Sequence, residues 1–190
     1  MDKIILKVRG LLGDFLTTVS DLFTYENSKI FSLTENNVGS VSEVYVNDEI
    51  SNITHTYNPT SNKVTITSSL ISGDAIKIDY TCYQNYSDTE ILSYIQAALI
   101  HLAINNYASF EYDSTTDAIY PTPESKEENL IAIVTSLLIN PDNRSIRLPD
   151  LTINIPNDIP TDQKISKTIA RYKKDTHGIF TLLDYPTDQV

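Results

Sequence analysis

The sequence has little of several things that common functional sites require. Its one cysteine, Cys82, excludes an intrachain disulfide, and its five glycines are too few to favour a glycine-rich phosphate loop. No apolar run approaches the length of a membrane-spanning helix, and residues 4–6 are too short a run for the core of a signal peptide. We therefore expect a soluble protein made in a reducing cytoplasm.

Basic residues are also scarce. The chain has 14 lysines and arginines against 25 aspartates and glutamates, which gives a formal net charge of -11 and a sequence pI of about 4.5. Proteins that bind nucleic acids or anionic membranes in general need a basic surface that neutralises phosphates, so the charge argues against both functions. The charge is compatible with an acidic surface past which DNA slides without sticking.

Helical spacing of apolar residues marks three segments. In residues 2–14 it predicts a short helix that Gly13-Asp14 ends. A second helix begins at Ser87-Asp-Thr-Glu90, which has the spacing of a capping box. Its apolar residues cover most of its circumference, so it is either the central helix of a bundle or half of a subunit interface. A third begins at Thr122-Pro-Glu124, with Pro123 at the first helical position, and ends at Pro141. Residues 111–120 are expected to form a polar loop.

The period changes to that of strands in residues 28–83. Short runs rich in Val, Ile, Thr and Tyr alternate with turn sequences such as Asn47-Asp48 and Ser72-Gly-Asp74. The pattern predicts a small antiparallel sheet, sandwich or open barrel with four or five strands. The expected strands cover residues 30–33, 41–46, 53–57, 63–67 and 75–80.

The last part of the chain reads differently. Residues 146–156 are extended and bracketed by prolines, which confine a strand to a sheet edge. A short helix over about 161–175 and a strand over 179–183 follow. The predicted fold class is therefore α+β. A small helical body (1–27 and 84–143) carries an inserted antiparallel β-rich subdomain (28–83) and an extended C-terminal arm (144–190).

Residues that could carry chemistry are scattered. His55, His101 and His177 have no metal-ligand spacing, and Cys82 lies in an apolar strand pattern that predicts a buried structural thiol. The acids of residues 111–117 lack the register of a calcium loop. We expect no catalytic residues, no metal and no cofactor. An enzyme with a site assembled from scattered acids stays an alternative.

One charge pattern is local. Lys164, Lys167, Arg171 and Lys174 step by three, four and three residues, so they form one basic stripe on the predicted fourth helix. The stripe is a solvated face, a contact with an acidic neighbouring subunit, or a contact with nucleic acid. Together with the extended segment it supplies the candidate subunit or portal interface: Lys164, Lys167, Arg171, Lys174, Leu148, Leu151, Ile153 and Ile155.

The order of these elements resembles a known family. A short first helix that ends in Leu11-Leu-Gly-Asp14, a long helix that begins at Ser87-Asp-Thr-Glu90, and a third that is entered through Tyr120-Pro-Thr-Pro123 resemble the head–tail connector (adaptor) proteins of tailed bacteriophages. The β block, with Val44-Tyr-Val-Asn-Asp48 and Ile76-Lys-Ile-Asp-Tyr80, also resembles segments of phage virion proteins. The resemblance covers residues 1–140.

The resemblance implies a non-enzymatic virion protein, made in the host cytoplasm and placed at the neck. About twelve copies would form a homo-oligomeric ring under the portal protein. The ring would extend the DNA conduit without specific DNA binding, contact further neck or tail proteins, and involve no membrane. The alternative is a tail-associated binding module whose β block recognises a carbohydrate or a host surface. Tyr45, Tyr57, Tyr80 and Tyr83 would favour it if they were exposed on one face; core and cross-strand packing is their other role.

Overall fold

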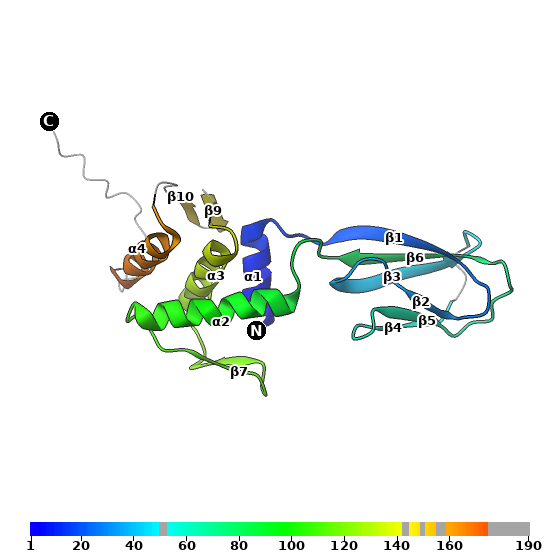
Figure 1. The fold of residues 1–190 in the computed structure, drawn as a ribbon, viewed down its shortest axis with the longest axis horizontal. Helices are drawn as coiled ribbons and strands as arrows, with labels where there is room; N and C mark the ends of the chain where they lie inside the picture. The colour runs from blue at the N-terminus through cyan, green and yellow to red at the C-terminus, as the bar shows by residue number, and fades with distance from the viewer. Residues whose placement is uncertain (50–52, 142–144, 149–150, 155–158, 175–190) are drawn as a thin grey trace. The chain divides into compact units, whose positions relative to one another are not determined.

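A computed structural model describes residues 1–49, 53–141, 145–148, 151–154 and 159–174. The chain divides into two compact units. One contains Met1–Leu12 and Ile91–Val190, and the other contains Gly13–Glu90. Helices dominate the first unit and antiparallel strands the second, so the predicted α+β class with an inserted β block is confirmed (Figure 1).

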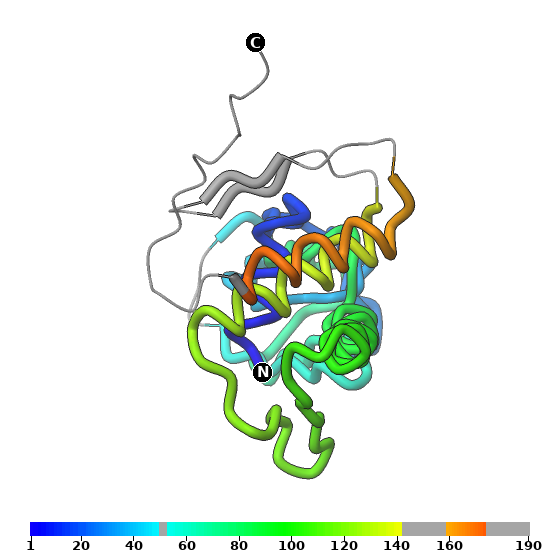
Figure 2. The backbone as a smooth tube through the Cα atoms, turned by 90° about the vertical axis from the view of Figure 1, so that its left-hand side faces the viewer, coloured from blue at the N-terminus to red at the C-terminus, as the bar shows by residue number. Residues whose placement is uncertain are grey.

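The helical unit is built around α3. Its helices are α1 (Asp2–Leu12), α2 (Asp88–Ile104), α3 (Ser125–Ile139) and α4 (Thr161–Lys174). α3 lies between α1 and α4, and α2 crosses them; Figure 2 shows α2 nearly end-on. Eight consecutive residues of α3, 130–137, are buried. The central helix is therefore α3, whereas the sequence had offered the preceding helix for that place.

The buried part of α3 includes two hydroxyl groups. Thr135 and Ser136 look like an exposed polar face, but both are buried and donate to backbone carbonyls of their own helix, those of Ile131 and Ile133, at 2.8 Å. A buried hydroxyl satisfied in this way does not need solvent. The helix also begins later than expected, at Ser125, because Glu124 and Glu127 form a capping box and Pro123 precedes it.

The other small elements of this unit are two hairpins. β7 (Glu111–Asp113) pairs with β8 (Ala118–Tyr120), where the sequence had predicted a polar loop. The Asp113 carboxylate accepts hydrogen bonds from the Thr115 N–H and the Thr116 hydroxyl, and these bonds lower the pKa of Asp113. The carboxylate of Asp113 thus stabilises the turn between β7 and β8. The second hairpin pairs β9 (Ser145–Leu148) with β10 (Leu151–Asn154).

The β unit is a sandwich of two three-stranded antiparallel sheets. One has the order β1-β6-β3, formed by Thr17–Thr24, Ala75–Cys82 and Val38–Val46. The other has the order β2-β5-β4, formed by Ile30–Ser32, Lys63–Ile66 and His55–Asn58. Alternate residues of both sheets face inward and form one core: Phe31, Leu33, Val44, Val64, Ile66, Ile76, Ile78, Tyr80 and Cys82. The five predicted strands match β2 to β6.

β1 was not predicted, and it corrects the proposed domain boundary. Residues 13–27 had been placed in the helical body, but β1 pairs with β6 over eight residues and belongs to the β unit. The strand is hard to predict from the sequence because the charged Asp21 occupies an inward position, where the alternating pattern of a strand would have an apolar residue. The carboxylate is buried and accepts hydrogen bonds from the Tyr80 hydroxyl at 3.1 Å and the Thr34 N–H at 2.7 Å.

The predicted C-terminal arm is only partly separate from the body. Its helix is confirmed as α4, but Ile165 and Ile169 of α4 are buried and the helix packs against α3. The strand expected over residues 179–183 lies outside the described residues. In the part of the chain that the structure describes, no helix is long and apolar enough to cross a bilayer.

Candidate assembly surfaces

The predicted basic stripe of α4 is interrupted. Lys164 is only 4% exposed, and its ammonium group donates a hydrogen bond of 2.6 Å to the carbonyl oxygen of Pro141. It lies on the α4 face that also contains the buried Ile165, Thr168 and Ile169, because that face packs into the helical unit. Lys164 is thus a buried structural lysine, which corrects its place in the candidate interface.

Lys167 and Arg171 of the stripe are exposed, as the sequence expected of all four residues. The side chain of Lys174 lies outside the described part. Lys173, which the sequence pattern did not select, is also exposed and donates a hydrogen bond of 2.6 Å to the carbonyl oxygen of Asn105, just after α2. A cation suits the negative end of a helix dipole. Lys167 and Arg171 therefore remain as the exposed basic pair of the stripe, and Lys173 lies on another side of α4.

Three of the four apolar interface candidates fall on the β9–β10 hairpin. Leu148 pairs with Leu151, and Ile153 pairs with Ile146, in an antiparallel register. The segment is therefore paired with itself instead of forming one long extended strand. Ile155 lies outside the described residues. Contact of these residues with another subunit stays a prediction.

α2 is apolar on two opposite sides. Ile91, Ile95 and Leu102 are buried on one side. On the other side an outer stripe, defined as Tyr94, Ala97, Ile100 and Ile104, follows helical spacings of three, three and four residues. Ile100 is 61% exposed and Ile104 is 70% exposed. A helix that is apolar all round is normally buried all round, so the outer stripe is a candidate contact surface for another chain.

The outward face of the β1-β6-β3 sheet carries a polar network. The Asp79 carboxylate accepts hydrogen bonds from Ser20 at 2.6 Å and from Lys77 at 3.0 Å. Partial burial works to raise the pKa of Asp79, but these bonds lower it overall. Lys77 also lies 4.7 Å from the centre of the Tyr45 ring. The Tyr45 hydroxyl donates to Glu43, and this bond raises the pKa of Tyr45 to about 12.

The four tyrosines proposed for a carbohydrate surface do not form one. Tyr80 is fully buried in the core, and Tyr57 is half-buried with its hydroxyl bonded to Asn62 at 3.1 Å. Lys77 lies over the ring of Tyr45, and Tyr83 is half-buried. The feature that would have favoured a binding module is therefore missing from the described surface. Their other role, core and cross-strand packing, fits Tyr80 and Tyr57 best.

Groups with reactive potential take structural places. Cys82 is buried, and desolvation raises the pKa of its thiol, which confirms the predicted structural thiol. His55 and His101 are half-buried, and His177 lies outside the described residues. Within the described ranges, no group of three or more His, Cys, Asp or Glu residues could hold a metal ion.

The comparisons with known proteins add no family assignment. No protein-family model matches the chain, and no curated protein is significantly similar to it in sequence.

Proposed function

We propose that the chain is a head–tail connector, a structural protein of a tailed-phage virion. In this role several copies form a ring at the neck, dock onto the portal protein and present a surface to further neck or tail proteins. The ring extends the conduit through which the genome passes. The protein contributes contacts and charge, and no catalytic step.

The observation that carries the proposal is the outer stripe of α2. Ile100 and Ile104 are exposed to solvent on a helix whose other side is already buried, so they do not contribute to the core of their own chain. Covering exposed apolar surface is the main driving force of association, at about 25 cal/mol per Å² of apolar area. A neighbouring copy that covers this stripe would bury it, so the stripe supports a subunit contact.

Charge and layout support the neck over other assemblies. The formal net charge of -11 suits a channel wall that repels DNA phosphates instead of retaining them. The β unit is an insert between α1 and α2, and the same order of elements carries the resemblance to phage connectors. Lys167 and Arg171, four residues apart on α4, supply an exposed basic pair in an acidic chain, which suits an acidic neighbour.

Assembly of the purified chain tests the subunit contact. Ile100→Asp combined with Ile104→Asp places charge on the outer stripe, so we expect this variant to stay monomeric where the unaltered chain forms a ring, alone or on its portal. Ile71→Asp is the matched control, because Ile71 is an isoleucine of similar exposure, at 77%, in the β unit. Particle mass is read by size-exclusion chromatography with light scattering. Equal masses for the double variant and the unaltered chain would overturn the assigned interface.

A further inference from the structure

The β1 strand is a long, regular sheet edge. It pairs with β6 through eight consecutive residue pairs, from Thr17↔Cys82 to Thr24↔Ala75, and the sheet order leaves its other side at the edge. The Tyr25 N–H donates to the Asp74 carbonyl, and the Asn47 N–H donates to that of Ala75. These two bonds fix the alternation of the ladder. The backbone groups of Thr18, Ser20, Leu22 and Thr24 therefore point away from β6.

The other three edges of the sandwich are better protected than β1. β3 is irregular at two places, between Val38 and Ser40 and between Val41 and Glu43. β2 has three residues and β4 has four. Bulges and short length are common devices that stop an edge from pairing with another chain. β1 has no register shift, no proline and no lysine. Its one charged residue, Asp21, faces inward, which is itself a protective device, but the Tyr80 hydroxyl and the Thr34 N–H already satisfy its carboxylate within the core.

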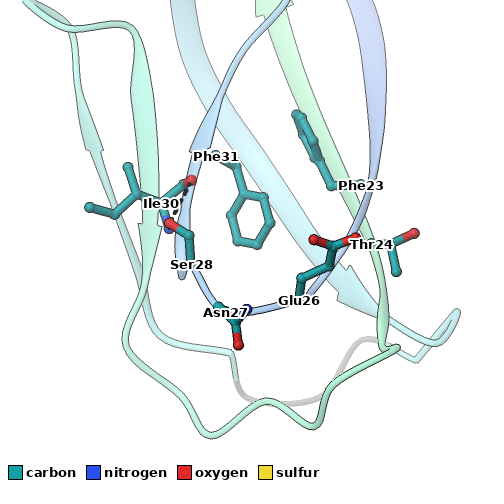
Figure 3. A pocket seen from close by; sticks show the side chains of 7 residues that line it. All are labelled: Phe23, Thr24, Glu26, Asn27, Ser28, Ile30 and Phe31. Carbon is teal, nitrogen blue, oxygen red and sulfur yellow. Dashed lines mark hydrogen bonds between the residues drawn. The ribbon is translucent and has the colours of Figure 1, made fainter.

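Two hollows with mixed apolar and polar linings flank the same end of β1. Figure 3 shows one of them, where Phe23 of β1 and Phe31 of β2 approach each other with their ring centres 5.2 Å apart. The lining of a second hollow combines the apolar Leu22 and Ala75 with the charged Asp48 and Lys77. Leu22 itself is 77% exposed. A strand added along β1 would place alternate side chains at each hollow, where the Phe23 and Phe31 rings on one side and Leu22 on the other offer apolar contacts.

We propose that this edge receives residues 179–183 of a second copy of the chain by strand addition. The sequence Ile179-Phe-Thr-Leu-Leu183 is uncharged, rich in strand-forming residues and apolar on both alternating sides. It lies within the segment that follows Lys174, the last residue of α4, up to Val190. Only residues 175–178 separate Lys174 from Ile179, and fully extended they span about 17 Å, so the receiving edge must lie close to the end of α4 of the copy that supplies the segment.

The edge and the added segment are different surfaces of the same chain, so the contact is head-to-tail, which produces a ring where the rotation between copies closes. The inference thus names a contact for the proposed ring and rests on that function for its setting. The two can fail separately, because strand addition is tested on purified protein and the neck role is tested on particles.

The test uses the full chain with its own segment disabled by Phe180→Asp and Leu182→Asp. A fluorescent peptide of residues 175–190 should bind this chain saturably, as read by fluorescence anisotropy. Adding Leu22→Lys should weaken binding about tenfold or more, because it removes an apolar contact and places a lysine on the edge. Ile71→Lys, at equal exposure in the same unit, should leave binding unchanged.

Three results would overturn the inference. The first is no saturable binding of the peptide to the disabled chain. The second is equal binding by the Leu22→Lys and Ile71→Lys forms. The third is an oligomer mass that Phe180→Asp and Leu182→Asp leave unchanged, because the segment would then not join one copy to another.

Discussion

The Asp14 carboxylate accepts two hydrogen bonds from Asn85, one from the backbone N–H at 3.3 Å and one from the side-chain amide at 3.2 Å. Asp14 is buried, and the two residues lie close to the ends of the β unit, Gly13 and Glu90. The pair therefore holds together the segments by which the chain enters and leaves the insert. It explains how a β unit can be carried within a helical chain without fraying at its base.

Removing this link should weaken the β unit. Asp14→Ala leaves the Asn85 groups without their acceptor, so we expect a loss of about 1–3 kcal/mol in the free energy of unfolding. Urea unfolding followed by circular dichroism measures it. Asp14→Asn keeps an acceptor oxygen and should recover part of the loss, and Glu26→Ala, at an exposed position of the same unit, should change little. A loss no larger for Asp14→Ala than for Glu26→Ala would contradict the structural role of the link.

Tyr80 predicts a specific alkaline behaviour. Burial and the nearby Asp21 carboxylate raise the pKa of Tyr80 from 10.0 to about 12, although the hydrogen bond from the Glu35 N–H works in the opposite direction. Between pH 10 and 12 the unfolded chain releases this proton and the folded chain keeps it. Stability present below pH 10 is therefore lost as the pH rises, by about 1.4 kcal/mol per pH unit for this group.

Tyr80→Phe removes that proton and should make the decline between pH 10 and 12 less steep, while tyrosines such as Tyr45 and Tyr172, whose pKa values are also raised, keep part of it. At neutral pH the variant should be less stable by about 1–3 kcal/mol, because buried Asp21 loses a hydrogen bond. Urea midpoints measured at several pH values give both quantities. Parallel alkaline declines for the variant and the unaltered chain would show that Tyr80 does not carry the effect.

Two lysines of α4 should respond differently to the same change. Lys164→Glu would bury a carboxylate against the Pro141 carbonyl, so we expect a loss of about 3 kcal/mol or more in the free energy of unfolding. Lys167→Glu alters an exposed side chain and should change stability by less than about 0.5 kcal/mol. It should instead weaken contact with an acidic neighbour. Thermal unfolding of the two variants checks the contrast, and equal melting temperatures would contradict the burial of Lys164.

Deleting residues 159–190 should destabilise the helical unit. The deletion removes Ile165 and Ile169, which are buried where α4 packs against α3. Removing two fully buried isoleucines costs at least about 4 kcal/mol at ordinary core values. The helical signal in circular dichroism should melt at a lower temperature than in the full chain. An unchanged melting temperature would contradict the packing of α4 into the helical unit and would support the separate C-terminal arm that the sequence predicted.

Most elements could be predicted because local patterns and tertiary environment agree. The strands β2 to β6 alternate apolar and polar residues between turn residues such as Asn47 and Asp48, which adopt the left-handed backbone that such turns require. The capping box at Ser87 and Glu90 marks the start of α2, and both of its hydrogen bonds are present. Alternation, capping and turn chemistry are properties of short segments, so they can be recognised in the sequence without knowledge of the fold.

The remaining features depend on contacts distant in sequence. β1 could not be predicted because the residue that satisfies its buried Asp21, Tyr80, is 59 residues away in the sequence. Lys164 looks like a surface cation because its acceptor, Pro141, belongs to another segment. Thr135 and Ser136 make α3 look one-sided although their hydroxyls are satisfied within the helix. The burial of Lys164 removes one residue from the candidate stripe on α4, and the outer stripe of α2, a helix that the sequence had already offered as half of a subunit interface, becomes the main candidate surface.

The most direct test of the proposed function is the position and copy number of the chain in purified phage particles. Cryo-EM of the neck should show a closed ring of about twelve copies beneath the portal, with the outer stripe of α2 buried between neighbours. Density for the chain at the tail tip, or its absence from the particles, would contradict the connector role.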